Sequence, residues 1–288
     1  MATVTAQQLQ YYYDHYRDSE ITLTKEAVRT LNLDLRQIYI KCNGNQWPCI
    51  INSTSLIQCK IIVGVKGGAY AMLSNKESDS VSVSVRFCFI NADRQSVPFF
   101  VNGHVQEIKS YMDSQELAII TIAFTQRPPD DLIEKLGAIF DANMNAANRK
   151  EERIVLNPEV KRKLGLEKEE TIVQVQGVPR HCILRDLSFS GTKIIMMGIQ
   201  KFILNQPVIL QMRFEDPDEL IKLTGTIVNT EAIQDRKDII TAAIKFDEAE
   251  VPIRYKIRVN NFLANMKKYL LTPNESEKPV SEDALPEI

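Results

Sequence analysis

The amino-acid sequence predicts a mainly β protein made of two small six-stranded antiparallel barrels, each closed by a helix at its C-terminal end. Three observations predict this fold. Strand-like segments follow one another in each half of the chain, a helical segment ends each series, and residue spacings recur between the halves. The chain has 288 residues, 44% of them hydrophobic and 25% charged, and is long enough for two domains with a core each.

The first half begins with two helical patterns, at 6–17 and 24–32, before its strands. Thr24 supplies a cap for the second helix, and Pro128-Pro129-Asp130-Asp131 starts a closing helix of about 15 residues, because acidic side chains are favourable at a helix N-terminus. Apolar residues alternate between 81 and 89, as in a half-buried strand. The expected strands are 37–42, 48–52, 58–63, 81–90, 99–108 and 117–124.

The second half repeats this order. A helix at about 252–269 closes it, and a polar, acidic tail at 272–288 is expected to be disordered. The expected strands are 171–176, 180–186, 192–197, 207–214, 221–229 and 239–246. We therefore expect a first barrel domain at 1–141, a linker at 142–153, a second barrel domain at 154–271, and the tail.

Spacings recur between the halves with an offset of 122 residues. Gly103 corresponds in this way to Gly225, and Phe124 to Phe246, and the offset also pairs Phe140 with Phe262. The spacings favour two copies of one unit. The alternative is a convergent pattern in two unrelated β domains, and the sequence leaves it open.

Composition excludes several classes of function. A net charge of -2 and a pI of about 6.0 provide no global basic field for non-specific nucleic-acid binding. The chain shows no secretory leader and no apolar run near the roughly 20 residues that cross a bilayer, so we expect a cytoplasmic protein without a membrane contact. Five widely spaced cysteines suggest small buried hydrophobic residues rather than disulfides or a metal site. Because known catalytic motifs are missing, we expect no enzyme activity and no cofactor.

Two short motifs bear on ligand binding. Arg149 and Arg153 form an R-x-x-x-R in the expected linker, and Asp186 to Gly191 form a D-x-S-x-x-G where one strand ends and another begins. R-x-x-x-R alone is weak, since Arg254 and Arg258 form a second copy that we interpret as a solvated helix face. Both motifs within a few tens of residues occur by chance in about one per cent of chains or fewer.

The paired motifs resemble those of the PilZ family, whose members are receptors for cyclic di-GMP. The resemblance covers about residues 145–270, including 223–228 and 243–246, which resemble the later strands of the family. The whole chain resembles spirochaete PilZ proteins that carry a second barrel-like domain before the PilZ unit. The resemblance implies cyclic di-GMP as the ligand.

The family assigns roles to the motif residues. Arg149 and Arg153 would close over the ligand, because an arginine fork can meet guanine O6 and N7, stack on a purine or pair with phosphate. Asp186 would accept from guanine N–H groups, and Ser188 would bind a phosphate oxygen or fix its loop. Gly191 would permit a tight turn and a close approach of backbone to ligand.

Three further residues complete the expected ligand set: Asn148, Lys150 and Ser190. The residue before R-x-x-x-R influences whether PilZ proteins bind one ligand or a stacked pair, so Asn148 leaves the ligand number open. Ala243 stands where the family often has glycine, and its methyl group is expected to narrow the base pocket.

The first half is expected to have lost this site. Shifting the D-x-S-x-x-G back by 123 residues reaches 63–68, where the aspartate and serine positions hold valines and no R-x-x-x-R precedes. We interpret these glycines as a turn in a barrel.

The expected function is a ligand-gated effector, in which the nucleotide orders residues 145–153 and changes the arrangement of the barrels and their contact with a downstream protein. The protein is expected to be a monomer. The alternative function is a nucleic-acid-binding regulator modulated by the dinucleotide, with a local basic face near Lys161–Lys163 or Arg254–Arg258.

Overall fold

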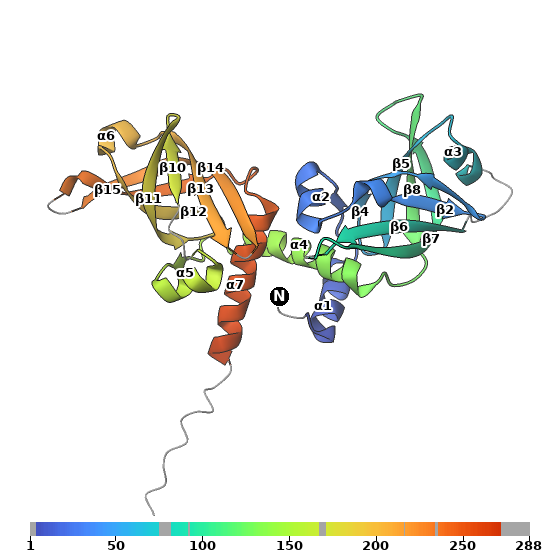
Figure 1. Cartoon of the computed structure of the whole chain (residues 1–288), viewed down its shortest axis with the longest axis horizontal. Helices are drawn as coiled ribbons and strands as arrows, with labels where there is room; N and C mark the ends of the chain where they lie inside the picture. Colours follow the sequence, from blue (N-terminus) through green and yellow to red (C-terminus); the bar gives the residue numbers. More distant parts are fainter. Residues whose placement is uncertain are drawn as a thin grey trace, which may run out of the picture.

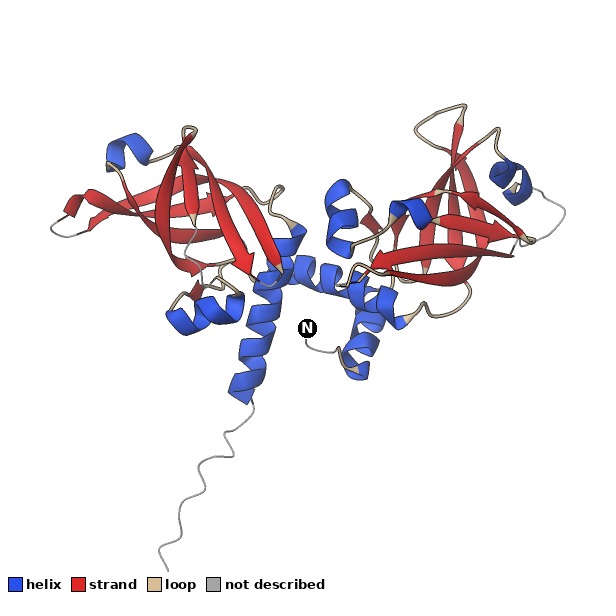
Figure 2. Cartoon of the chain, viewed as in Figure 1, coloured by secondary structure: helices blue, strands red, loops and turns tan. Residues whose placement is uncertain are grey.

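The computed structural model describes residues 4–74, 82–91, 93–166, 171–215, 217–233 and 236–271, with two β-rich units. Figures 1 and 2 show the two units side by side, with helices between and below them. The tail predicted at 272–288 lies outside the described residues. Within the described part, no helix is long and apolar enough to cross a membrane.

The first unit is an antiparallel sheet that curls into a barrel, in the order β1-β4-β5-β8-β7-β6-β2-β3. β3 and β4 are separated only by Cys49, so together they act as one bent strand. The strands are β1 (Ile21–Thr22), β2 (Tyr39–Cys42), β3 (Asn45–Pro48), β4 (Ile50–Thr54), β5 (Gln58–Gly64), β6 (Ser82–Ile90), β7 (Ser96–Ser110) and β8 (Leu117–Phe124). The helices are α1 (Ala6–Tyr16), α2 (Lys25–Leu31), η1 (Leu35–Gln37), α3 (Gly68–Leu73) and α4 (Asp130–Asn148).

The second unit contains a closed six-stranded antiparallel barrel. Its order is β10-β13-β14-β15-β12-β11, and pairing of β10 with β11 closes the ring, while β9 adds to the outer edge of β11. The strands are β9 (Ile154–Val155), β10 (Ile172–Val175), β11 (Val178–Leu187), β12 (Gly191–Met197), β13 (Pro207–Glu215), β14 (Asp218–Ile233) and β15 (Arg236–Phe246). The helices are α5 (Pro158–Leu164), α6 (Gln200–Ile203) and α7 (Ile253–Leu271).

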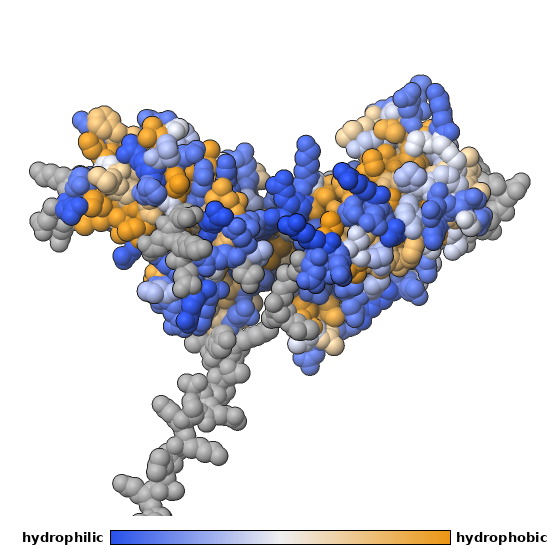
Figure 3. All heavy atoms as spheres, viewed as in Figure 1, coloured by the Kyte–Doolittle hydropathy of each residue, from blue (hydrophilic) through white to orange (hydrophobic). Residues whose placement is uncertain are grey.

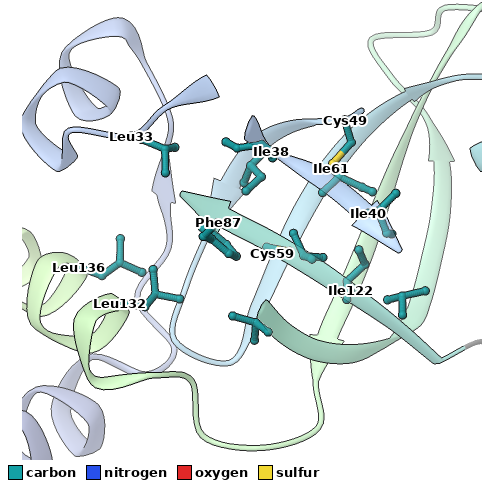
Figure 4. Close-up of a cluster of buried hydrophobic side chains, with 14 of the residues drawn as sticks. Leu33, Ile38, Ile40, Cys49, Cys59, Ile61, Phe87, Ile122, Leu132 and Leu136 are labelled. Carbon is teal, nitrogen blue, oxygen red and sulfur yellow. The ribbon is translucent and has the colours of Figure 1, made fainter. Parts of the chain in front are cut away.

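Each barrel has its own hydrophobic core, as the alternating patterns predict. In β6 the buried residues include Val83, Val85 and Phe87, and Figure 4 shows Phe87 together with Leu132 and Leu136 of α4. All five cysteines are buried and unpaired, as predicted, and burial raises the pKa of the Cys49 and Cys182 thiols to about 12.

The units are structural copies of each other. Gly103 pairs with Phe124 as Gly225 pairs with Phe246, and a bulge follows at the same place in both ladders. The turns after β2 and β10 also match, because each contains two residues with positive φ (Asn43-Gly44 and Gln176-Gly177). This agreement in register and turn geometry favours one repeated unit over convergence.

The offset between the copies changes along the chain. Before β6 it is 133 residues, as from Ile21, which pairs with Thr54, to Ile154, which pairs with Leu187. It falls to 122 by Gly103 because the first unit has longer connections on both sides of β6, at 65–81 and 91–95, than the second has at 198–206 and 216–217. The single offset expected from the sequence therefore holds only for the C-terminal part of each copy.

Helix α4 joins the two units. It closes the first barrel and packs against α1 at one end and α7 at the other, and Figure 1 shows it running between the barrels. Asp141 accepts hydrogen bonds from Tyr16 of α1 (2.9 Å) and Asn260 of α7 (2.7 Å), and Asn260 accepts one from Asn145 (2.8 Å). Residues 142–148, predicted to begin the linker, are instead helical, so the connection to β9 is 149–153.

Candidate ligand-binding site

The R-x-x-x-R segment is the connection between α4 and β9. Arg149 is the residue that ends α4, and its N–H still bonds to the carbonyl of Asn145 at 2.8 Å. The negative end of the helix dipole favours a cation at this place. β9 then pairs with β11, with Ile154 opposite Leu187, and this pairing carries Arg153 to the D-x-S-x-x-G turn.

The two motifs meet in an ion pair. Nη1 of Arg153 lies 2.9 Å from Oδ1 of Asp186, with the side chains 38% and 12% exposed. The same carboxylate oxygen accepts the backbone N–H of Lys193 on β12 at 2.8 Å. The carboxylate is therefore fixed to the barrel on one side, while the guanidinium approaches it from the solvent side.

Ser188 holds the turn together. Its hydroxyl donates to the carbonyl of Gly191 at 3.0 Å and accepts from the N–H of Gly191 at 3.1 Å, and the side chain is fully buried. Of the two roles expected for this hydroxyl, the geometry matches the fixing of the loop. Ser190 donates to the carbonyl of Lys150 at 2.8 Å, which attaches the turn to the R-x-x-x-R segment.

Gly191 does not have the tight-turn role that was expected of it. The φ angle of Gly191 is not in the positive, left-handed range, so the backbone conformation does not require a glycine there. A Cβ at Gly191 would lie 2.3 Å from the carbonyl oxygen of Ile244, because β12 and β15 approach closely at this point. Gly103 and Gly225 face the same restriction, at 2.4 Å from a neighbouring carbonyl oxygen. The glycine thus serves barrel packing.

The remaining predicted residues surround this centre less directly. Arg149 lies 3.9 Å from Glu152 through its Nε, and Lys150 pairs with Glu248 at 2.7 Å. The hydrogen bond from Lys150 lowers the pKa of the Glu248 carboxyl group. Asn148 is an exposed residue at the end of α4. The contacts therefore unite Arg153, Lys150 and Ser190 with the aspartate and serine of the turn, while Arg149 and Asn148 lie beside them.

Sequence reasoning missed two residues of the site. The backbone of Lys193, two positions after the motif, orients Asp186. Tyr255 of α7 donates its hydroxyl hydrogen to the carbonyl of Ser188 at 2.7 Å. Tyr255 is 67 residues from that turn, so no local pattern in the sequence indicated the contact.

A hollow of about 590 Å³ opens on the outside of the second barrel. Its lining includes Thr226, Val228 and Lys245, and Lys245 lies opposite Gly191 in the ladder of β12 and β15. The hollow therefore begins beside the D-x-S-x-x-G turn. Within the described residues, no cluster of His, Cys, Asp and Glu could hold a metal ion.

The second R-x-x-x-R does not form the solvated face that was expected. Arg254 and Arg258 are 28% and 15% exposed and both face Glu219, and Arg258 also lies over the ring of Phe214 at 4.4 Å. Both guanidinium groups are therefore engaged in contacts between α7 and the second barrel. This removes one of the two basic faces considered for nucleic acid.

The first unit carries an altered counterpart of the site, at a different place from the one expected. Strand register matches the D-x-S-x-x-G turn with residues 53–58, whereas 63–68 lie at the end of β5 and the start of α3. Ser55 makes the same turn bonds as Ser188, accepting from Gln58 N at 3.1 Å. Glu20 stands where the second unit has Arg153, and it pairs with Lys60 at 2.9 Å. The charge that would meet an anionic ligand is therefore reversed.

Comparisons with known proteins match the two units of the chain to two domain models. Residues 7–143 match the PilZN3 domain model, and residues 147–263 match the PilZ domain model. A Treponema denticola protein named "Cyclic di-GMP binding protein" is 43% identical over 270 residues, which cover 93% of this chain and 85% of that protein.

Two solved structures are also similar. The Borreliella burgdorferi PlzA protein in complex with c-di-GMP is 22% identical, with 89% of this chain and 98% of that chain covered and a TM-score of 0.40. The K. pneumonia MrkH–c-di-GMP complex is 12% identical, with 88% and 97% covered and a TM-score of 0.30. Given the domain matches and the T. denticola relative, the chain belongs to the PilZ family.

Proposed function

We propose that the second unit binds cyclic di-GMP between the 149–153 segment and the 186–191 turn, and that the protein is a receptor without enzyme activity. The observation that carries the proposal is the 2.9 Å contact between Arg153 and Asp186, which joins the two motifs at one place. The name of the T. denticola relative supports the choice of ligand.

The chemistry of the residues suits this ligand. Cyclic di-GMP has two phosphate charges and two guanines, and a guanidinium can pair with either group. Among the described residues, hydrogen bonds to the Asp186 side chain reach Oδ1 only. Oδ2 is therefore able to accept from a guanine N1–H or N2–H. The hollow beside Lys245 offers room for the second base and a cation for a phosphate.

Binding is expected at one unit of the chain only. In the first unit a carboxylate, Glu20, takes the place of Arg153, and Tyr16 takes the place of Arg149. An anionic ligand would meet repulsion there instead of an ion pair. A structure of the full chain with the ligand tests this part directly, because the first unit should be empty whether the second holds one dinucleotide or a stacked pair.

Ligand binding is proposed to change the arrangement of the units and the contact with a downstream protein. Arg149 continues directly from α4, which closes the first barrel and contacts α7. A ligand that draws Arg149 away from Glu152 therefore acts on the helix that joins the units. Small-angle scattering with and without ligand would show a changed radius of gyration, and identical curves would contradict this step.

Calorimetric titration of the full chain tests the function itself. Cyclic di-GMP should bind saturably, while GTP and cyclic di-AMP should bind far more weakly, since only cyclic di-GMP offers two guanines in one ring. Absence of heat and of retained nucleotide with the folded protein would overturn the proposal.

A further inference from the structure

The first turn of α7 contacts both the ligand turn and the first unit. Tyr255 reaches the D-x-S-x-x-G turn, while its two preceding neighbours, Ile253 and Arg254, reach α2 of the first unit. Three consecutive residues of one helix thus connect two parts of the molecule that are far apart in sequence. Figure 1 shows the start of α7 between the second barrel and α2 of the first unit.

The buried side chain of Tyr255 donates a hydrogen bond to the ligand turn from a fixed position in the second unit. The side chain is fully buried, and its ring packs edge-on against Phe246 at 5.8 Å between centroids. Burial raises the pKa of the phenol, so its hydroxyl stays protonated and donates to the Ser188 carbonyl at 2.7 Å. Ile133 of α4 takes the equivalent place in the first unit, and it is likewise fully buried. The phenol therefore occurs in the unit that has the ligand motif, and the other unit fills the space with a hydrocarbon.

The neighbouring contacts attach the same turn to the first unit. The N–H of Ile253 donates to the carboxylate of Glu26, which satisfies an otherwise free amide at the start of α7. Nη2 of Arg254 donates to the carbonyl of Arg29 at 2.6 Å. Ile253 also packs against the core of the first barrel. On the face drawn in Figure 3, hydrophilic side chains, in blue, cover much of the region between the two units.

We infer that Tyr255 is a positioning residue for the ligand site, and that residues 253–255 make ligand affinity depend on the contact with Glu26. The inference rests on the proposed function, because the turn held by Tyr255 is the one proposed to bind cyclic di-GMP. A shift of α7 relative to α2 moves the Ser188 carbonyl, and with it the loop beside Asp186. By linkage, a ligand that orders the loop strengthens the contact between the units to the same degree.

Tyr255→Phe tests the positioning role. The substitution removes one hydrogen bond and keeps the ring, so cyclic di-GMP affinity in calorimetry should fall about fivefold. Tyr12→Phe is the matched control, since it removes another buried hydroxyl, one that contacts Gln8 within α1. The control should bind as the wild type does. Equal binding by wild type and Tyr255→Phe would overturn the inference.

A double-mutant cycle separates positioning from a general loss of stability. Glu26→Ala, which removes the acceptor of the Ile253 N–H and is remote from the ligand motifs, should weaken binding about threefold in the wild type and by less than about 1.5-fold in the Tyr255→Phe background. The exposed Glu107→Ala serves as the control and should change affinity in neither. Additive effects of Glu26→Ala and Tyr255→Phe would refute the coupling. Failure of the wild type itself to bind would instead remove the proposed function, so the two failures are distinguishable.

Discussion

Replacing Arg153 by alanine should lower ligand affinity far more than it lowers the stability of the fold. The guanidinium is 38% exposed and pairs with an aspartate that keeps its second anchor, the N–H of Lys193, after the substitution. A partly exposed ion pair of this kind contributes about 0.2–1 kcal/mol to folding. We therefore expect the free energy of unfolding to fall by less than about 1 kcal/mol, and the midpoint of thermal unfolding by at most about 4 °C.

The affinity for cyclic di-GMP should fall by a larger free energy than the stability does. Hydrogen bonds to a charged group contribute about 1.5–3 kcal/mol, and each 1.4 kcal/mol is a factor of ten in affinity. Arg153→Ala should thus weaken cyclic di-GMP binding about 10- to 150-fold. The loss of the pair with Asp186 adds repulsion between that carboxylate and the ligand phosphates, which places the expected value toward the upper end.

Calorimetry and thermal unfolding on the same preparations measure both effects. Arg213→Ala is a matched control, because Arg213 also forms an ion pair at 2.8 Å on the second barrel, with Asp218. It should leave affinity within twofold of the wild type. The reasoning is refuted if Arg153→Ala binds as tightly as the wild type, or if Arg213→Ala loses affinity to the same extent.

Three other substitutions have defined outcomes. Arg149→Ala should weaken binding at least tenfold with an unchanged unfolding midpoint, and calorimetry that shows wild-type affinity would exclude this residue from the site. Gly191→Ala places a Cβ 2.3 Å from the carbonyl oxygen of Ile244 and should lower the urea midpoint by an amount equivalent to about 1–3 kcal/mol; an unchanged midpoint would contradict the packing role. Burial opposes ionisation of Glu20, but hydrogen bonds from Ser53 and Lys60 outweigh this effect and lower the pKa of the carboxyl group. The contribution of this carboxylate to stability is therefore fully present above the unfolded pKa of about 4.3. It is lost as the pH falls through the folded pKa. Urea unfolding at pH 7 and at lower pH should show a smaller acid-induced loss in Glu20→Gln than in the wild type, and equal losses would argue against this pair.

The strand pattern and the ligand motifs were predictable because each has a local signature. Alternation of apolar residues predicts β6, and the spacing of Arg149, Arg153, Asp186 and Ser188 indicates the segment and the turn that meet in the candidate site. The meeting of the two motifs depends on pairing between β9 and β11, two strands about thirty residues apart. A two-residue strand such as β9 is too short to show periodicity.

Other features depend on tertiary packing and escaped prediction for that reason. The D-x-S-x-x-G counterpart in the first unit was misplaced because the longer connections around β6 change the offset between the copies. The need for Gly191 comes from the carbonyl of Ile244 on another strand. Arg258 was expected in solvent, but it lies between Glu219 and the ring of Phe214, which only the fold brings together.

A crystal structure of the full chain grown with cyclic di-GMP tests the central claim most directly. We predict that the dinucleotide lies against the second barrel, with the guanidinium groups of Arg149 and Arg153 and the carboxylate of Asp186 in contact with it, and that the first unit is empty. A dinucleotide bound near Glu20 and Lys60, or bound elsewhere with these three side chains turned away, would contradict the account.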